Sequence, residues 1–560
     1  MKVAIIGAGA SGLTAIKCCL DEGLVPTCYE RSEELGGLWN YKDDVRPGQG
    51  SVMKSTVINT SKEMMCYSDF PIPAEFPVFM HNKYVMQYFK MYAKQFGLEN
   101  YIQFSTEMHI NSLRLTGTAT LKILLKMRRK HVKIVSLKRS KEFSSTGQWD
   151  ITVKHKTTGK EEEHVYDAVL VCTGHHADVH IPQFPGLDRF RGKVLHSHDF
   201  RHTAGYEGKR VLIVGIGNSG GDAAVELSRV ASQVFLSTRR GSWILNRVAD
   251  HGLPLDMANL SRFTTTLASL MPNLAQSFAE GQLNKKFDHA LYSLKPKHRI
   301  FQQHPMVNDD LPNRIACGAI NIKSNVMEFT ENGVQFDDGT FVDDIDVVIL
   351  ATGYVFGFPF MEKGLIDVRQ NKVELFKYMF APELERPTLA VVGCFQPIGA
   401  IMPICELQCR LATRVFKGDV TLPSKDEMWS DIRTKATIMS HKYVECQRHT
   451  IQVDFITFLD ELAQLNGCKP NFGAMFLRDP VLAWKCIFGP CTPYQFRLEG
   501  PGRWKGARAA IMTQWDRTLQ PLKTRPLGAE VEVKGSSLGF LKFLVVFVGL
   551  FVLLLSFCMQ

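Results

Sequence analysis

Two glycine-rich motifs carry the clearest chemistry in the sequence. The first consists of Gly7, Ala8, Gly9, Ala10, Ser11 and Gly12, and the second has its glycines at Gly215, Gly217 and Gly220. Glycines at this spacing allow a tight turn and a close approach of the backbone to a pyrophosphate, and the unpaired N–H groups at the start of the next helix bind the anion. The sequence therefore predicts two sites for dinucleotides.

The residue that follows the second strand distinguishes the two sites. Glu30 ends the strand expected after the first motif, where a carboxylate accepts hydrogen bonds from ribose hydroxyls. Counted from the first glycine of each motif, the corresponding residue is Thr238, and Arg239 and Arg240 come next. Since a guanidinium pairs with the 2′-phosphate that a carboxylate would repel, the second site is predicted to prefer NADPH to NADH. The alternative is that the two arginines form a solvated pair.

Each motif lies between a predicted strand and a predicted helix. Strands are expected at residues 2–6, 25–29, 210–214 and 233–237, and helices at 13–22 and up to 226. Residues 167–174 and 346–353 share the pattern D-x-V-x-x-x-T-G, before the second motif and after its domain. The pattern predicts an α/β fold with two Rossmann-like domains, the second inserted in the first, at residues 1–176, 177–349 and 350–525, followed by a linker and anchor at 526–560.

Composition excludes several classes of protein. The chain has 560 residues, of which 22% are charged and 45% hydrophobic, as in a packed globular protein rather than a disordered one. Its net charge of +10 equals the ten basic residues between positions 108 and 141, where there is no Asp or Glu. The rest of the chain is balanced, so we expect no nucleic-acid partner.

Cysteine and histidine give no metal signature. Fourteen cysteines without a C-x-x-C pair favour reduced thiols, and Cys405 and Cys409 suit packing on one helix face. His175, His176 and His180 have no acidic or cysteine partners at ligand spacing, which favours a surface loop. No metal site is predicted.

The C-terminus is predicted to anchor the chain in a membrane. Residues 543–558 contain no charged residue, and the apolar span at 538–559 is interrupted only by Lys542. Lys523, Arg525 and Lys534 precede it and favour the cytosolic side for the preceding chain. An obliquely inserted helix and a buried core helix are the alternatives.

Several short motifs together resemble flavin-containing monooxygenases. Phe190, Gly192, His196 and Phe200 fit the F-x-G-x-x-x-H-x-x-x-Y/F signature of that family, and it lies between the two glycine motifs. Residues 35–39 (LGGLW), 59–64 (NTSKEM) and 351–354 (ATGY) and the hydrophobic C-terminus are also similar. The resemblance is to the animal microsomal type, and residues 293–298 and 443–452 are most similar to the fifth mammalian form.

The resemblance implies FAD in the first site and NADPH in the second. NADPH would reduce the flavin, and O2 would add at flavin C4a to form a hydroperoxide, shielded by bound NADP⁺, that transfers one oxygen atom to small lipophilic substrates. Similarity to the fifth form implies Baeyer–Villiger oxidation of ketones to esters at the endoplasmic reticulum membrane. The alternatives are N- or S-oxygenation of amines and sulfides, as in xenobiotic metabolism, and a largely uncoupled NADPH oxidase that makes H2O2. A nucleotide-sensing scaffold would need damaged glycine motifs, and both are intact.

The resemblance also implies site residues, matched by motif. Asn59 would be catalytic, its amide donating to the peroxide and accepting from the nicotinamide side; a turn or capping role is the alternative. The FAD site would be lined by the first glycine motif, Glu30, Leu38, Trp39, Asn59 and Thr60. The NADP⁺ site would include Ser197, His198, Asp199, Phe200, Thr238, Arg239 and Gln396. The segment Ser197–Phe200 departs from the usual Ser-Arg-Asp-Tyr, so a fixed positive charge and a hydroxyl group are lost.

A basic segment at about 116–140 is the larger departure from the family. Its alternating apolar and basic residues suit an anionic membrane surface, a solvated helix or hairpin without a role, or an erroneous or rare splice product. The substrate pocket is expected to include residues 258–311. A homo-oligomer stays an open alternative.

Overall fold

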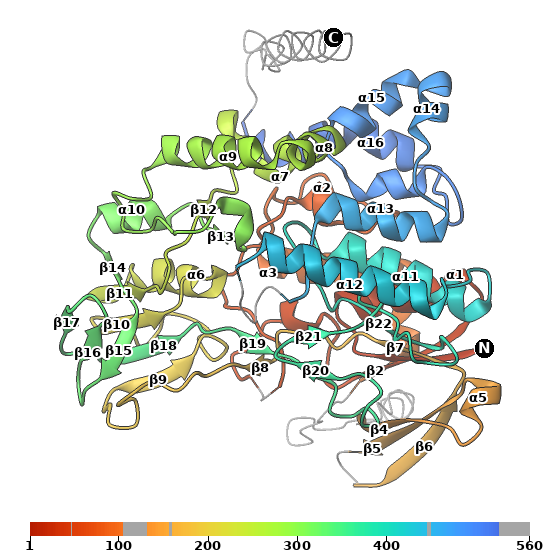
Figure 1. Ribbon diagram of the computed structural model, residues 1–560, viewed down its shortest axis with the longest axis horizontal. Coiled ribbons are helices and arrows are strands. Elements are labelled where there is room, and N and C mark those ends of the chain that lie inside the picture. Colours follow the sequence, from red (N-terminus) through yellow and green to blue (C-terminus); the bar gives the residue numbers. More distant parts are fainter. Residues whose placement is uncertain (46–47, 105–131, 156–158, 445–449, 526–560) are drawn as a thin grey trace, which may run out of the picture.

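Each half of the molecule is built on a five-stranded parallel β-sheet (Figure 1). The structure is a computed structural model, and it describes residues 1–45, 48–104, 132–155, 159–444 and 450–525. The first sheet has the order β22-β7-β1-β2-β3. Its strands are β1 (Lys2–Ile6), β2 (Val25–Glu30), β3 (Ile102–Phe104), β7 (Ala168–Val171) and β22 (Leu389–Val391). β1 and β7 are buried almost throughout, as expected for parallel strands covered on both faces.

The second sheet repeats this local plan. Its order is β14-β11-β10-β18-β9. The central strand β10 pairs with β11 and β18, just as the central strand β1 of the first sheet pairs with β2 and β7. Its strands are β9 (Lys193–His196), β10 (Arg210–Val214), β11 (Gln233–Ser237), β14 (Ile320–Lys323) and β18 (Val347–Leu350). The predicted strands, including the two with the D-x-V-x-x-x-T-G pattern, are confirmed, and so is the α/β class.

The chain passes between the two sheets twice, and the two passages lie side by side. All strands of the second sheet fall between β7 and β22 in the sequence. β8 (Asp178–Val179) and β19 (Tyr354–Val355) follow β7 and β18 and pair antiparallel with each other at the junction between the halves. This order fits one nucleotide domain inserted in another, and the bounds of the four predicted ranges (1–176, 177–349, 350–525 and 526–560) stay predictions.

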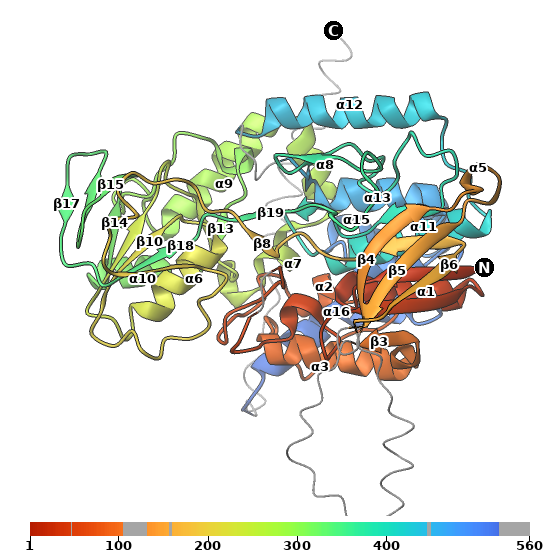
Figure 2. The same cartoon turned by 90° about the horizontal axis from the view of Figure 1, so that it is seen from below.

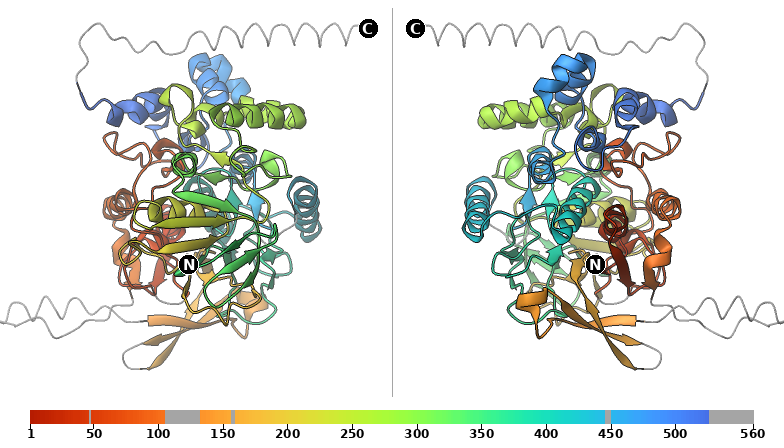
Figure 3. Two further views of the ribbon diagram at one scale, coloured as in Figure 1. Left: turned by 90° about the vertical axis from the view of Figure 1, so that its left-hand side faces the viewer. Right: turned by 90° about the vertical axis from the view of Figure 1, so that its right-hand side faces the viewer.

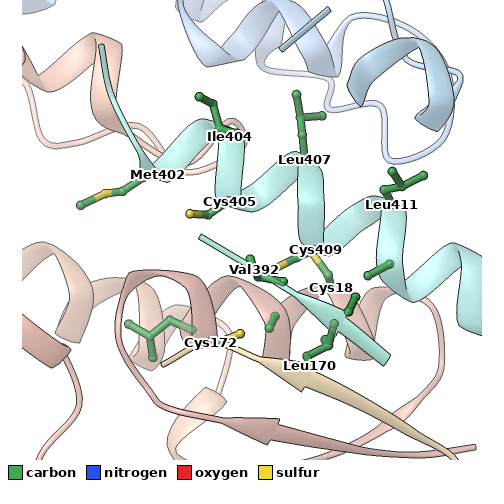
Figure 4. Close-up of a cluster of buried hydrophobic side chains, with 14 of the residues drawn as sticks. Cys18, Leu170, Cys172, Val392, Met402, Ile404, Cys405, Leu407, Cys409 and Leu411 are labelled. Atoms are coloured by element: carbon green, nitrogen blue, oxygen red, sulfur yellow. The ribbon is translucent and has the colours of Figure 1, made fainter. Parts of the chain in front are cut away.

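Helices pack against the first sheet. α1 (Ala10–Asp21) and α11 (Met402–Lys417) pack against each other, and α13 (Phe455–Asn466) packs on the far side of α11. Figure 4 shows Cys405 and Cys409 of α11 turned toward β7, while Leu407 and Leu411 point the other way. Both thiols are fully buried, so the prediction that they pack on one helix face is confirmed. The described cysteines are all free thiols.

A third, antiparallel sheet lies at one end of the molecule. It consists of β4 (Val132–Arg139), β5 (Trp149–His155) and β6 (Glu161–Tyr166), at the end away from α14 (Phe472–Arg478) and α15 (Pro480–Phe488) (Figure 3). β4 belongs to the basic segment, and Leu137 within it is fully buried and bonded through its backbone to Phe360 and Glu362. The last part of that segment is therefore a strand of the fold, and residues 116–131 lie outside the described residues.

The remaining elements connect and cover these sheets. In Figure 2, α12 (Lys425–Lys442) runs along one side of the molecule and α3 (Asn82–Gln95) along the opposite side. The other helices are α2 (Lys62–Met65), α3 (Asn82–Gln95), α5 (Phe143–Thr146), α6 (Asn218–Leu227), α7 (Leu255–Asn259), α8 (Arg262–Leu270), α9 (Pro272–Lys286), α10 (Leu311–Ala316), α12 (Lys425–Lys442) and α16 (Ala507–Leu519). The other strands are β12 (Ile244–Leu245), β13 (Met306–Val307), β15 (Val326–Phe329), β16 (Val334–Phe336), β17 (Phe341–Val342), β20 (Val368–Arg369), β21 (Lys372–Val373), β23 (Gln396–Pro397) and β24 (Gln452–Val453).

Within the described ranges, no helix combines the length and apolar composition that a membrane crossing needs. The membrane helix predicted at 538–559 lies outside those ranges.

Candidate functional site

The first glycine motif forms the turn between β1 and α1. Gly7 has a φ of +102°, a conformation that L side chains rarely adopt. A Cβ atom on Gly12 would lie 1.8 Å from the carbonyl oxygen of Gly7, so only glycine fits there. No acidic residue occupies the first turn of α1, and nothing there repels an anion at the N–H groups that begin the helix.

Glu30 lies beside this turn, as predicted. It is 6% exposed, and its carboxylate accepts hydrogen bonds from the backbone N–H of Ala8 and of Ser32, each at 2.7 Å. Each oxygen keeps a second lone pair, so the carboxylate can close the turn and still accept from another hydroxyl.

Leu38 and Trp39 are brought to the same turn by backbone contact. They lie in a short 3₁₀ helix, Gly37–Trp39. The N–H of Gly36 donates to the carbonyl of Ala8 at 2.9 Å, and a Cβ on Gly37 would lie 3.2 Å from the Cα of Gly9. The two predicted FAD-site segments therefore lie against each other.

Ser11 faces α11 from the start of α1. Its hydroxyl donates to the Cys405 Sγ at 3.2 Å, and the Cys409 Sγ lies 3.6 Å from its carbonyl oxygen. Burial raises the pKa of the Cys405 thiol to about 12, so this thiol is neutral and serves packing.

The residues after Asn59 anchor it by buried polar contacts. Ser61 donates from its N–H (2.7 Å) and its hydroxyl (3.0 Å) to Asp256 in α7. The ammonium of Lys62 is fully buried and donates to three backbone carbonyls between residues 73 and 76. Glu63 accepts from Tyr494 at 2.5 Å and from Arg517 at 3.1 Å. These contacts fix the backbone that carries Asn59 and Thr60, both of which are half-buried.

Burial changes the acidity of two of these anchors. Desolvation lowers the pKa of Lys62 to about 8, partly offset by the charge of Glu63. Desolvation also raises the pKa of Asp256 to about 6, against hydrogen bonds from Ser61 that lower it. The segment is tied to the first glycine motif as well, because the Tyr67 hydroxyl donates to the Ala10 carbonyl at 2.7 Å.

Asn59 itself is bound by a residue that no sequence motif predicts. The Arg247 guanidinium donates from Nη2 to Asn59 Oδ1 at 2.8 Å. Arg247 is held in turn by Asp309, which accepts from its backbone N–H at 2.9 Å and from Nη1 at 3.1 Å. No local pattern in the sequence marks Arg247, since it follows a two-residue strand and its partner is far along the chain.

The second glycine motif has the geometry of the first. Gly215 has a φ of +112°, and a Cβ on Gly220 would lie 2.0 Å from the Gly215 carbonyl oxygen. The first turn of α6 also lacks an acidic residue. Further along α6, desolvation raises the pKa of Asp222 to about 6, although Asn308 donates to it at 2.8 Å.

Thr238 and Arg239 lie at the end of β11, as predicted. The Thr238 hydroxyl accepts from the Gly241 N–H at 3.0 Å and shapes the turn after the strand. Arg239 and Arg240 are exposed. An exposed guanidinium at this place is accessible to a 2′-phosphate, and the predicted preference for NADPH stays a prediction.

The segment Ser197–Phe200 joins the two halves. His198 is 4% exposed, with Nε2 at 2.6 Å from the Gln49 carbonyl and Nδ1 at 2.8 Å from the Asp199 carboxylate. Arg201, which no sequence motif predicts either, donates to the Val52 carbonyl at 2.6 Å and hydrogen-bonds Ser51. The segment therefore holds a loop of the first half against the second.

Phe200 and Gln396 complete the predicted set. Phe200 is buried and packs edge-on against Tyr206, so it belongs to the core of the second half. Gln396 is half-buried in β23, and its N–H donates to the Ile451 carbonyl at 2.7 Å. The roles of these residues toward cofactors stay predictions.

The expectation of a surface loop at the histidines is wrong for His175. This residue is 9% exposed, its Nδ1 lies 3.1 Å from the Gly393 carbonyl, and burial lowers its pKa to about 4. His176 packs against His175 and Tyr354, and the His180 N–H donates to the Gly353 carbonyl. The reason is that both passages between the sheets meet here and cover the segment. The described residues contain no group of three or more His, Cys, Asp or Glu placed to hold a metal.

Comparison with known proteins adds to this geometry. A family model described as flavin-binding monooxygenase-like matches residues 1–120 and 110–556, and its two parts overlap at the start of the basic segment. The chain is 51% identical over 527 residues to flavin-containing monooxygenase 5 of Cavia porcellus, covering 94% of this chain and 93% of that protein. It is 47% identical over 560 residues to dimethylaniline monooxygenase (N-oxide-forming) 2 of the same species, covering 99% of each.

Solved structures of lower identity share the fold. S-allyl-L-cysteine S-oxygenase from Allium sativum matches with a TM-score of 0.62 at 23% identity, covering 93% of this chain and 98% of that one. Cyclohexanone monooxygenase from Rhodococcus sp. Phi1, bound to NADP⁺, matches with a TM-score of 0.57 at 14% identity, covering 83% and 96%.

Proposed function

Because the chain belongs to the flavin-binding monooxygenase-like family and is an NADPH-dependent flavin monooxygenase that uses FAD, we propose that it inserts one oxygen atom of O2 beside the carbonyl of small lipophilic ketones. The balanced reaction is ketone + NADPH + H⁺ + O2 giving ester + NADP⁺ + H2O. The similarity to flavin-containing monooxygenase 5 proteins and the fold shared with a cyclohexanone monooxygenase support the ketone class.

The position of Arg247 carries this proposal. Its guanidinium lies against Asn59, and its side chain is 12% exposed, so its charge acts in a poorly solvated place. A fixed positive charge there favours negative charge on a reacting oxygen, which is the polarity that attack on a ketone carbonyl requires. Amines and sulfides instead attack as nucleophiles, so the transferred oxygen must be the electrophile, and negative charge on that oxygen does not favour their reaction.

The residues present fit both cofactors. Both glycine turns leave no room for a Cβ on their last glycine, and both helices that follow begin without an acidic residue. Bound FAD takes two electrons from NADPH and activates O2 for transfer of one oxygen atom.

The protein contributes binding, orientation and exclusion of water. The N–H groups at the start of α1 and α6 would hold the two pyrophosphates, and Glu30 would accept from a ribose hydroxyl. Asn59 would donate from its amide nitrogen to the reacting oxygen without releasing a proton to it. The buried residues Lys62 and Glu63 keep Asn59 in place. Separating either buried charge from its hydrogen-bond partners would cost free energy, because the charge would be left unpaired.

A paired product assay tests the proposal. Detergent-solubilised protein with FAD, NADPH and O2 receives an aliphatic ketone in one tube and a methyl sulfide in the other, with H2O2 titrated in both. Ester with little sulfoxide is the expected result. Sulfoxide without ester would assign the chain to heteroatom oxygenation, and H2O2 alone would mean uncoupled NADPH oxidation. Omission of NADPH is the control for product formed without the enzyme cycle.

We also propose membrane attachment at the endoplasmic reticulum through residues 538–559. Support comes from the helices α9 and α14, which lie at the top of Figure 1, on the same side as α16. Both carry large apolar side chains that are exposed. Leu274 and Phe278 of α9 are 62% and 67% exposed, and Leu477 of α14 is 89% exposed. Such a face suits contact with lipid. Flotation of the full chain with liposomes, compared with a chain ending at 525, should show loss of tight binding in the shorter protein.

A further inference from the structure

The second glycine motif is connected to Asn59 through a small parallel sheet. In Figure 1, β12 and β13 lie between α6 and α2. The side chain of Asn218, in the first turn of α6, accepts from the Val307 N–H in β13 at 2.8 Å. One turn later, Asp222 accepts from the Asn308 amide at 2.8 Å. The helix that begins at the motif therefore holds the end of β13 at two points.

The same sheet holds Arg247. Asp309 follows Asn308 and accepts two hydrogen bonds from Arg247, one from its backbone and one from Nη1. Arg247 follows β12, and β12 pairs with β13. The orientation of the guanidinium is thus set by the β12–β13 sheet, which is bound to α6, rather than by solvent.

The contact with Arg247 decides which way the Asn59 amide points. Guanidinium nitrogens only donate, so the atom of Asn59 at 2.8 Å from Nη2 must be the oxygen. The amide nitrogen, the donor assigned to the reacting oxygen, then points away from Arg247. Without Arg247 the amide is free to flip, and either atom could face the reaction.

One hydrogen-bond donor of Arg247 is unused among the described residues. Its Nε is buried and has no hydrogen-bond partner among the described residues, and the same holds for the Oδ1 of the neighbouring Asn246. Unpaired buried polar atoms are rare in folded proteins, and a bound group commonly satisfies them.

We propose that Arg247 is a positioning residue that couples the second dinucleotide site to Asn59. A dinucleotide bound at the start of α6 restricts the motion of Asn218 and Asp222, and these two side chains hold β13. The residue Asp309, just after β13, then keeps Arg247 hydrogen-bonded to the Asn59 oxygen. The inference rests on the proposed role of Asn59. It predicts that the orientation of Asn59, and with it the yield of oxygenated product, depends on an arginine outside the flavin half.

The test compares Arg247→Ala, Asn59→Ala and the double variant in the full chain. The readouts are FAD content, NADP⁺ affinity from the flavin absorbance change, and H2O2 formed per NADPH. Arg247→Ala should keep FAD and raise H2O2 per NADPH toward one. Because coupling between two sites is reciprocal, it should also weaken NADP⁺ binding, by about tenfold where the charged hydrogen bond to Asn59 is fully coupled to the second dinucleotide site. The double variant should form no more H2O2 per NADPH than Asn59→Ala alone, because both changes remove the same correctly oriented Asn59 amide.

Two further variants complete the test. Asp309→Asn keeps Arg247 but weakens the contact that orients it, so H2O2 per NADPH should rise in part. Arg247→Lys keeps the charge without the forked donors, so it should be less uncoupled than Arg247→Ala. Arg314→Ala is the matched control, because Arg314 donates to Ser228 at 2.8 Å at the far end of α6. It should leave coupling unchanged.

The outcomes separate the two hypotheses. If Asn59→Ala uncouples but Arg247→Ala and Asp309→Asn do not, the positioning role is wrong. Additive uncoupling in the double variant would also overturn it, since Arg247 would then act independently. If Asn59→Ala itself forms product normally, the proposed role of Asn59 fails instead.

Discussion

His198 Nε2 lies 2.6 Å from the carbonyl oxygen of Gln49, so a buried ring at the end of β9 holds a loop of the flavin half. Its Nδ1 faces the Asp199 carboxylate at 2.8 Å. Both partners only accept, so a ring nitrogen that carries a hydrogen donates to the partner it faces.

We expect His198→Phe to raise the KM for NADPH by about tenfold, the order for loss of two ring hydrogen bonds, while FAD content stays normal. His202→Phe, at an exposed position nearby, is the control. Steady-state kinetics at several NADPH concentrations give the answer, and an unchanged KM would show that the ring only fills space.

Gly9 and Gly12 should respond differently to alanine. A Cβ on Gly9 would lie 3.6 Å from Gly37 Cα, an ordinary contact, whereas on Gly12 it would meet the Gly7 oxygen at 1.8 Å. We expect Gly9→Ala to fold but lose FAD, and Gly12→Ala to lose about 3 kcal/mol or more of stability, beyond the usual range for overpacking. Thermal unfolding and flavin absorbance separate these effects. Full FAD content in Gly9→Ala would mean that the backbone at Gly9 is not approached by the cofactor.

Asn59→Ala should bind FAD and oxidise NADPH but lose oxygenated product. The neighbouring anchors at Ser61, Lys62 and Glu63 do not involve the Asn59 side chain, so the fold should persist. The measurement is ester and H2O2 per NADPH. Unchanged product yield would leave Asn59 as a turn residue.

Arg239→Ala should reduce the preference for NADPH over NADH by about tenfold or more, as expected for a charge-assisted contact. Arg240→Ala is the matched control, because both side chains are exposed on the same turn. The ratio of kcat/KM for the two cofactors is the readout. A change in Arg240→Ala alone would transfer the role to that residue.

His289 should make stability depend on pH. It is fully buried, its Nε2 accepts from the Ile244 N–H at 3.1 Å, and its Nδ1 faces Asn284 Oδ1 at 2.8 Å. Burial lowers its pKa from 6.5 to about 4. Because the folded pKa lies below the unfolded one, this stability is fully present above pH 6.5 and is lost as the pH falls through about 4.

The wild-type Tm should therefore fall more steeply than that of His289→Gln between pH 6.5 and 4. His251→Gln, at an exposed position, should follow the wild type. Parallel Tm curves for wild type and His289→Gln would show that His289 does not titrate in this range.

The sequence by itself determined the two glycine turns, the strands on either side of them and the position of Glu30. These features are local: a positive φ at Gly7 and Gly215 and the space around Gly12 and Gly220 depend on residues a few positions apart. Both D-x-V-x-x-x-T-G segments are buried strands of parallel sheets for the same reason, since continuous apolar runs suit strands covered on both faces.

The tertiary structure alone decided what surrounds Asn59. Arg247, Asp309 and Asp256 reach the motif from segments far along the chain, and the burial of His175 follows from two passages that meet between the sheets. No spacing rule encodes such contacts, because they depend on how the halves pack and where the connecting loops run. Local residue types set the backbone geometry of each cofactor turn, and long-range packing set the partners of the residue proposed to carry the chemistry.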